Sequence, residues 1–200
     1  MKILGRGWQY TTYDLRNGRV LKKYNSLVVA YIVMFFAYLN SDRLSFFKLP
    51  EYYKGCKETA RDSMKKVKSG VLESWMMGNP KVLNELDYEQ DVLIPLHDCI
   101  NNVTLEEAKK WVDKFVSFNK LLVERSLIDK SFNITKNFAI DSSERVVLMD
   151  LGELYSSKAA IDEQRRKRMW AYPYVVDCIL QEEMRIYYLK QMDENFGLVT

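Results

Sequence analysis

The chain has 200 residues, of which 48% are hydrophobic and 13% aromatic, so it can bury a packed core and global disorder is excluded. Its net charge of +3 is too small to indicate a nucleic-acid-binding protein, and a single histidine argues against a multi-histidine metal site. The three cysteines are widely spaced and odd in number, which is typical of free thiols in a reducing compartment. We therefore expect a cytoplasmic protein.

The first elements of the chain are expected to be a hairpin over 9–24 and a helix over 27–39. Asn17-Gly18 predicts a two-residue type I′ turn in the hairpin, because both positions of that turn favour positive φ. Ser26 is the expected helix cap, and Asn40-Ser41-Asp42 is expected to end the helix. The helix is wholly apolar but shorter than the about 20 residues that a bilayer requires. We therefore expect it to be buried, and we expect no transmembrane segment.

Later elements follow from apolar spacing and from turn signals. Thr104-Leu105-Glu106-Glu107 is a capping box that opens a long helix ending near Arg125. The other expected elements are a helix over 57–69, a strand over 86–94, two short strands over 138–140 and 146–149, and helices from Lys158 onward. This order of strands and helices predicts an α+β fold, with a strand-rich N-terminal lobe over 1–96 and a short helical C-terminal lobe over 97–200.

The N-terminal strands carry two glycines and a lysine that are candidates for binding a phosphate group. Gly5 and Gly7 lie at the end of a strand, where glycine lets the backbone approach phosphate oxygens. Val20 and Lys22 share one face of a later strand, because side chains alternate between faces. Lys23 remains a rival for Lys22 if the register is shifted by one residue. The alternative is an ordinary glycine-bearing strand end followed by two solvated lysines.

A second group of candidates lies in the C-terminal half. Asp150-Leu151-Gly152 follows an apolar strand, so the carboxylate is expected at the strand end. Asn137 lies 13 positions earlier and opens the preceding strand. A carboxylate and an amide oxygen are hard ligands that suit Mg²⁺. The alternative for Asp150 is a turn residue beside a glycine.

Together these two segments resemble the ATP-binding parts of the protein-kinase-like superfamily, over roughly residues 3–154. The resemblance implies a minimal kinase fold, nearer to small bacterial or phage kinase-like proteins, lipopolysaccharide-core kinases and aminoglycoside phosphotransferases than to eukaryotic protein kinases. No Ala-Pro-Glu motif follows Asp150. ATP and Mg²⁺ are the implied cofactors. The implied ligands are Gly5, Gly7, Val20 and Lys22 for ATP, and Asn137 and Asp150 for the metal.

The resemblance breaks at the catalytic loop. The family places an aspartate five residues before the metal-binding asparagine, and this chain has Phe132 there. A phenylalanine cannot accept a proton from a hydroxyl group. Asp129 and Asn133 are the nearest polar candidates for a catalytic role, and Asp129 reaches the site only if the loop is rearranged. The alternative for Asp129 is a structural role in the loop after the long helix.

Two further departures leave the function open. Tyr10 stands where the family has its third loop glycine, and the apolar helix has no acid to pair with Lys22. Glu58 and Glu73 are the candidates for that acid. Three functions follow: a phosphotransferase acting on an unknown protein or small-molecule acceptor, a pseudokinase that senses nucleotide or serves as an interaction module, and a small helical interaction protein or effector without a nucleotide site.

One basic run stands apart from these motifs. Arg165-Arg166-Lys167-Arg168 lies close to Trp170 and follows two acidic residues. A solvated helix face is the simpler interpretation. The alternative is a surface for an acidic partner, a phosphate group or an anionic lipid.

Overall fold

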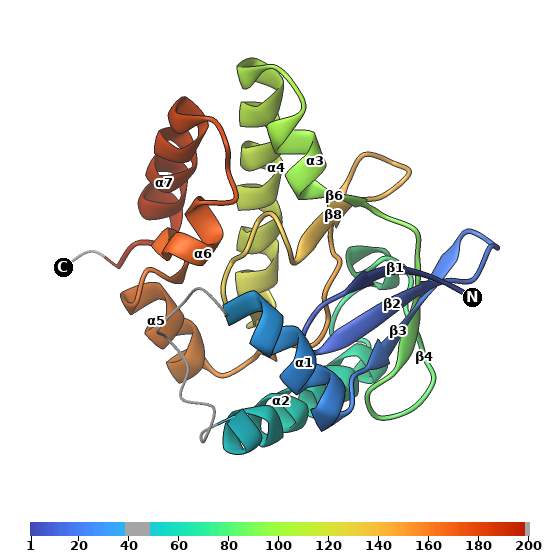
Figure 1. Ribbon diagram of the computed structural model, residues 1–200. Coiled ribbons are helices and arrows are strands. Elements are labelled where there is room, and N and C mark those ends of the chain that lie inside the picture. Colours follow the sequence, from blue (N-terminus) through green and yellow to red (C-terminus); the bar gives the residue numbers. More distant parts are fainter. Residues whose placement is uncertain (39–48, 199–200) are drawn as a thin grey trace.

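The computed structural model describes residues 1–38 and 49–198, and it confirms an α+β fold. A five-stranded antiparallel sheet forms the N-terminal part, in the order β1-β2-β3-β5-β4. Its strands are β1 (Lys2–Arg6), β2 (Tyr10–Asp14), β3 (Arg19–Tyr24), β4 (Lys81–Val82) and β5 (Tyr88–Asp91). Figure 1 shows this sheet beside α1 and α2, with the remaining helices on the other side of the molecule.

The C-terminal part consists of helices around two small sheets. One sheet has the order β6-β8-β9 and the other pairs β7 with β10. The strands are β6 (Ile94–Pro95), β7 (Ile128–Asp129), β8 (Phe138–Ile140), β9 (Val146–Leu148) and β10 (Leu154–Tyr155). The helices are α3 (Leu96–Asn101), α4 (Leu105–Glu124), α5 (Lys158–Arg166), α6 (Pro173–Val176) and α7 (Glu182–Phe196), with short turns η2 (Ser74–Met77) and η3 (Met169–Ala171). Helices α4 and α7 pack side by side (Figure 1).

The expected hairpin between β2 and β3 is present, but its turn is longer than predicted. Positive φ occurs at Arg16 (59°) and Gly18 (77°) and not at Asn17, so the type I′ assignment is wrong. Side chains account for the difference. Asp14 Oδ1 accepts from the Arg16 N–H at 2.7 Å, and Asn17 Oδ1 accepts from the Arg19 N–H at 3.2 Å. Such local side-chain bonds stabilise turns that backbone bonds alone do not favour.

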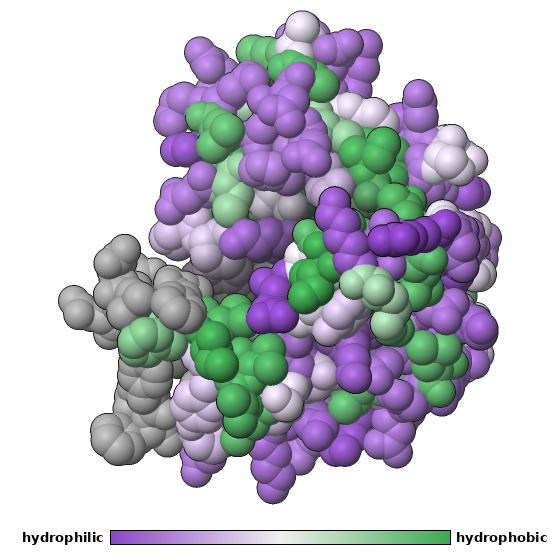
Figure 2. Space-filling view, turned by 45° about the vertical axis from the view of Figure 1, so that its right-hand side comes forward, coloured by the Kyte–Doolittle hydropathy of each residue, from purple (hydrophilic) through white to green (hydrophobic). Residues whose placement is uncertain are grey.

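Helix α1 (Leu27–Tyr38) begins where predicted, and Ser26 Oγ accepts from the Val29 N–H at 3.4 Å. The expectation of burial is wrong, because Val28 is 67% and Ile32 is 50% exposed while Ala30 is buried. Figure 2 shows apolar side chains gathered on the surface of this helix. Within residues 1–38 and 49–198, no helix is both long and apolar enough to cross a membrane. The predicted end at 40–42 lies outside the described residues.

Helix α2 (Leu49–Ser69) starts well before the predicted residue 57. Pro50 and Glu51 explain the early start, because proline is tolerated in the first turn and an acidic side chain there favours the helix dipole. Helix α4 has the predicted capping box, in which Thr104 and Glu107 bond to each other's backbone N–H groups. These starts therefore follow from local sequence chemistry.

The predicted strand over 86–94 is shorter in the structure, where β5 covers Tyr88–Asp91. Asn84 Oδ1 accepts from the N–H groups of Leu86 and Asp87, both at 2.8 Å, and this turn delays the strand. The hairpin of β8 and β9 is confirmed. The expected boundary between the two lobes, after residue 96, falls at the first residue of α3.

Candidate functional site

A cavity of about 320 Å³ lies between the five-stranded sheet and the segment that follows β9. It brings together residues that are far apart in the sequence. Strands β1 and β3 contribute one wall of the cavity. Strand β5 and the residues that follow it contribute another wall. The residues that matter for the chemistry are Gly5, Val20, Lys22, Gln90, Leu93 and Met149.

Lys22 faces this cavity together with Val20, and Lys23 lines a different cavity on the opposite face of β3. The predicted alternation of these side chains is therefore confirmed. Lys22 Nζ donates a hydrogen bond to the Met149 carbonyl oxygen at 2.5 Å. Burial lowers the pKa of Lys22, and the negative charge of Asp150 opposes that shift. The Lys22 amino group thus lies in the cavity, next to the start of the Asp150 segment.

Gln90 is a site residue that the sequence interpretation missed. Its Nε2 donates to the carbonyl oxygens of Met77 and Leu148, both at 2.8 Å, which fixes the orientation of the amide. Gln90 is 1% exposed, and its Oε1 has no hydrogen-bond partner in the described part of the chain. A buried acceptor without a partner costs about 1–3 kcal/mol. The sequence could have indicated Gln90 through strand alternation, because alternate side chains of a strand share a face and Gln90 therefore lies on the same inward face as Tyr88.

Asn137 and Asp150 meet at the end of the β8–β9 hairpin. The Asn137 carbonyl oxygen accepts from the N–H groups of Met149 at 2.8 Å and Asp150 at 3.2 Å. Asp150 Oδ1 accepts from the Gly152 N–H at 2.9 Å. The backbones of the two predicted metal ligands are therefore in contact. Among the described residues no group of three or more His, Cys, Asp or Glu side chains is arranged to hold a metal.

Asp129 lies directly behind Asn137. Asp129 Oδ2 accepts from Asn137 Nδ2 at 2.8 Å, which leaves Asn137 Oδ1 available as a ligand. Asp129 Oδ1 accepts from the backbone N–H groups of Ser131 at 3.2 Å and Asn133 at 3.3 Å. Burial raises the pKa of Asp129 to about 7, although the bond from Asn137 opposes the rise. A carboxyl group that titrates near neutrality thus supports the candidate metal site.

Phe132 does not occupy the position of a catalytic side chain. It is fully buried, and its ring packs edge-to-face on Trp170 with the centroids 5.6 Å apart. Its φ of 51° bends the loop, so that Asp129 is the residue that lies beside Asn137. Asn133 is also buried, and its Oδ1 accepts from Thr135 Oγ1 at 3.0 Å. The side chain of Asn133 therefore holds the loop in shape.

The glycine loop closes over the Asp150 segment more tightly than expected. The Gly7 N–H donates to the Tyr10 carbonyl oxygen at 2.8 Å, which makes a turn. A Cβ added to Gly152 would lie 2.8 Å from Gln9 Oε1 and 2.9 Å from Tyr10 Cε2, so any larger residue there would displace these two side chains. The Tyr10 hydroxyl is buried and has no hydrogen-bond partner within residues 1–38 and 49–198, and burial together with Asp150 raises its pKa. The Tyr10 ring thus fills space beside the candidate metal ligands.

Neither predicted glutamate pairs with Lys22, and both assignments are wrong. Glu58 is exposed, and Glu73 instead forms a salt bridge with Arg125 at 2.9 Å. A further acid that the sequence interpretation missed is Glu153, which pairs with Lys130 at 3.0 Å. Gln9 Nε2 also donates to Glu153 Oε1, at 3.1 Å. This network ties the glycine loop to the segment after Asp150.

The basic run of α5 is engaged inside the chain. Arg165 Nε donates to the Phe196 carbonyl oxygen at 2.8 Å, and Arg168 forms a salt bridge with Asp193. Arg166 and Lys167 both pair with Glu163. These bonds favour a local structural role for the run over the recognition of an acidic partner.

The cavity and the segments beside it therefore contain a buried lysine amino group, an asparagine and an aspartate whose backbones are hydrogen-bonded, and a carboxyl group with a pKa of about 7. Such groups can neutralise phosphate charge, hold a divalent cation and accept a proton. A scan against models of known protein families matches none of them, and a search of curated proteins finds no similar sequence.

Proposed function

We propose that this chain is a kinase-like protein that binds ATP with Mg²⁺ and transfers a phosphoryl group to a protein or small-molecule acceptor. The observation that carries the proposal is the contact between Lys22 and the Asn137–Asp150 pair through Met149. Lys22 lines the 320 Å³ cavity and donates to the Met149 carbonyl oxygen, and the Asn137 carbonyl oxygen accepts from the N–H groups of Met149 and Asp150. Lys22 would bind the phosphates, and Asn137 Oδ1 with an Asp150 oxygen would hold Mg²⁺. Positioning and charge neutralisation supply most of the catalysis in phosphoryl transfer.

The base of the nucleotide would lie against Val20 at the apolar end of the cavity, with Gly5 above it. Gln90 lines the cavity, and its Oε1 is a buried acceptor without a partner among the described residues. The exocyclic amino group of adenine is a donor and would satisfy it, whereas guanine presents a carbonyl oxygen at the same position. Because two facing acceptors repel each other, the proposed site selects ATP over GTP.

Asp129 has two roles in this proposal. Its bond to Asn137 Nδ2 directs Asn137 Oδ1 toward the metal, which is a positioning role. Its pKa of about 7 also suits a general base that works at neutral pH. The contribution of Asn133 is indirect, because its backbone N–H donates to Asp129 and its side chain shapes the loop.

The test is nucleotide-dependent stabilisation. A ligand that binds only the folded state at 100 times its Kd stabilises the protein by about 2.7 kcal/mol. We expect ATP with Mg²⁺ to raise the melting temperature, and Asp150→Ala to abolish the Mg²⁺-dependent part while the circular dichroism spectrum is unchanged. Asp98→Ala is the matched control, because Asp98 is exposed and outside the cleft. The absence of any shift at millimolar ATP and Mg²⁺, with silent calorimetry, would contradict the proposal.

A pseudokinase is the second candidate, and the Tyr10 ring favours it. This ring lies against Gly152, and the Gly7 N–H is already bonded within the loop, so the loop offers fewer free donors to phosphates. ATP labelled at the γ- or α-phosphate distinguishes the two candidates. Transfer of label to the protein itself or to a lysate supports the phosphotransferase. Nucleotide binding without transfer from either label, under any divalent metal, supports a nucleotide-sensing or interaction module.

We also propose a cytoplasmic location. The support is that Cys56, Cys99 and Cys178 are free thiols, and Cys56 is buried. Reduced cysteines of this kind are typical of proteins in reducing compartments. Alkylation of the three thiols in the denatured protein, isolated from cells without reductant, tests this placement, and disulfide-linked forms would contradict it.

A further inference from the structure

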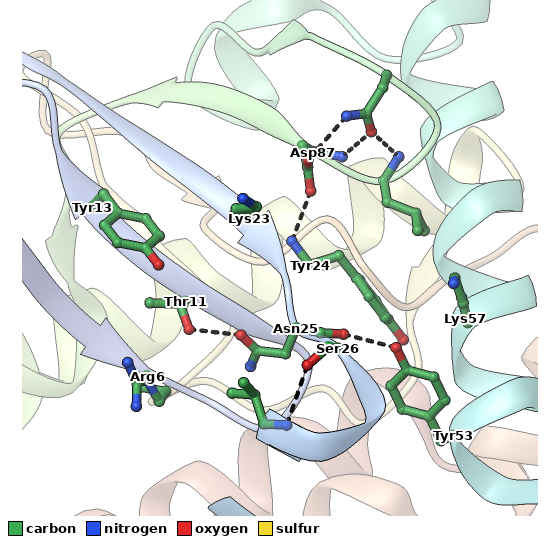
Figure 3. Close-up of a pocket in the computed structure, with 13 residues that line it drawn as sticks. Arg6, Thr11, Tyr13, Lys23, Tyr24, Asn25, Ser26, Tyr53, Lys57 and Asp87 are labelled. Atoms are coloured by element: carbon green, nitrogen blue, oxygen red, sulfur yellow. Dashed lines mark hydrogen bonds between the residues drawn. The ribbon is translucent and has the colours of Figure 1, made fainter. Parts of the chain in front are cut away.

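A second and larger cavity, of about 520 Å³, lies on the opposite face of the same sheet. Figure 3 shows that residues from several elements surround it. Strands β1, β2 and β3 contribute one side, the first turn of α1 another, and α2 faces them. The cavity does not share a lining residue with the candidate nucleotide site. Its chemistry can therefore be considered on its own.

Three cationic side chains from three elements line this cavity. They are Arg6 of β1, Lys23 of β3 and Lys57 of α2 (Figure 3). None of them has a salt bridge or a side-chain hydrogen bond to another described residue. Elsewhere the chain pairs cations readily, as Arg19 does with Asp91 at 2.7 Å. Positive charges on one cavity wall repel each other, so an anionic ligand would be favoured here.

One carboxylate also lines the cavity, but its oxygens are already engaged. Asp87 Oδ1 accepts from the Tyr24 N–H at 2.8 Å, and Asp87 Oδ2 accepts from Asn84 Nδ2 at 2.9 Å. These bonds direct the carboxylate toward the start of β5 and the end of β3. The positive charges of the cavity therefore outnumber its negative charge by two.

The start of α1 adds a second source of positive potential. Helix α1 has 12 residues, and its first turn contains no acidic side chain, so the partial positive charge of its N-terminus is not compensated. Ser26 and Val29 of this turn line the cavity. Helix N-termini of this kind bind phosphate and other anions. The hydroxyl group of Ser26 is a further donor at the same place.

Aromatic rings form the remaining wall. Tyr13 and Tyr53 both line the cavity, and the Tyr53 hydroxyl donates to the Asn25 carbonyl oxygen at 2.7 Å, which fixes its ring (Figure 3). Rings next to a cluster of cations suit a ligand with an organic part as well as a charge. A volume of about 520 Å³ is also typical of small-molecule sites, which range from about 300 to 1,000 Å³.

We propose that this cavity binds a phosphorylated small organic molecule. Arg6, Lys23 and Lys57 hold the phosphate group, and the rings of Tyr13 and Tyr53 contact the organic part. Arginine and lysine are the usual partners of phosphate oxygens, and charge-assisted bonds are the stronger ones. The proposal does not depend on the nucleotide site, because the two cavities lie on opposite faces of the sheet.

Isothermal titration calorimetry with phenyl phosphate and with inorganic phosphate tests this site. We expect phenyl phosphate to bind more tightly, and the double variant Lys23→Gln/Lys57→Gln to lose at least tenfold in affinity for it. The matched control is Lys54→Gln/Lys68→Gln, which removes two exposed charges of α2 outside the cavity. Lys22→Met reports on the nucleotide site and should leave phenyl phosphate binding unchanged.

Several results would overturn the proposal. The first is that neither probe produces heat with the wild-type protein. The second is that the control double variant loses as much affinity for phenyl phosphate as Lys23→Gln/Lys57→Gln. The third is that Lys22→Met loses as much of this affinity as Lys23→Gln/Lys57→Gln. A flotation experiment with phosphatidic acid vesicles adds a second arm. If the protein binds the vesicles but not phenyl phosphate, the ligand of this cavity is a lipid headgroup and the proposal of a soluble ligand is wrong. Wild-type levels of phenyl phosphate binding in a correctly folded Lys23→Gln/Lys57→Gln variant would also refute the site.

Discussion

Asp129→Asn should remove a pH dependence of stability that one buried carboxyl group creates. Asp129 is 1% exposed, and burial, with a smaller contribution from Glu153, raises its pKa from the ordinary value of 3.8 to about 7. The folded pKa is above the unfolded one, so the folded chain binds this proton more tightly between pH 4 and 7. The free energy of unfolding therefore falls as the pH rises through that range.

The size of the effect follows from the two pKa values. A rise from 3.8 to about 7, at about 1.4 kcal/mol for each pH unit, gives at most about 4 kcal/mol lost between pH 4 and 8. The asparagine variant cannot titrate and should lack this loss. Its amide nitrogen must face either Asn137 Nδ2 or the N–H groups of Ser131 and Asn133, which leaves a donor unpaired. That mismatch costs about 1–3 kcal/mol.

Urea denaturation of both proteins at pH 4.5 and pH 8 measures the difference. We expect the variant to be the less stable protein at pH 4.5 and to equal or exceed the wild type at pH 8. Asp98→Asn, at an exposed position, is the control and should follow the wild-type curve. If the free energy of unfolding changes with pH in the same way for Asp129→Asn and the wild type, the reasoning is refuted. That result would mean that the Asp129 carboxyl group is hydrated. If Asp129 is also the general base, turnover should fall at least tenfold, with little change in nucleotide affinity.

Three further predictions concern single side chains. Tyr10→Phe removes a buried hydroxyl without a partner and should stabilise the fold by about 1 kcal/mol, whereas Tyr188→Phe, which loses a bond to a carbonyl oxygen, should destabilise it by a similar amount in thermal unfolding. Lys22→Met should weaken ATP binding more than Lys23→Met in calorimetry, and equal losses would count against the assignment. Gln90→Met should bring the affinities for ATP and GTP closer together, and an unchanged ratio would exclude Gln90 as the selective residue.

The features that the sequence predicted are those that depend on short-range chemistry. The capping box at Thr104 and the hairpin of β8 and β9 need only neighbouring residues and a turn. The separation of Lys22 from Lys23 follows from the alternation of side chains on any strand. In each case the residues that cause the structure lie within a few positions of each other, so a single sequence is sufficient to predict it.

The catalytic loop shows why the rest could not be predicted. Counting five residues back from Asn137 reaches Phe132, but the path of the loop decides which side chain enters the cleft. That path depends on Trp170 and Phe196, which lie far along the chain and whose rings hold Phe132 in the helical core. The same limit applies to Gln90, because the carbonyl groups that orient its amide come from two other segments.

Adjacent residues of the same strands line the two cavities. Gly5, Thr12 and Lys22 are paired across β1, β2 and β3 and line the candidate nucleotide cavity. The next row along the strands, Arg6, Thr11 and Lys23, lines the second cavity. Each strand therefore passes from one cavity to the other within a single peptide unit.

Such a connection links the backbone beside one cavity to the backbone beside the other. A ligand that moves the peptide units at Arg6 and Lys23 also moves those that carry Gly5 and Lys22, because these residues adjoin along β1 and β3 and are paired through β2. We therefore expect saturating phenyl phosphate to change the Kd for ATP, with the reciprocal change in its own Kd by the same factor. Couplings of this kind are typically about 5–150-fold. Equal ATP affinities with and without phenyl phosphate, in a protein that binds both, would show that the sheet is too rigid to connect its two faces.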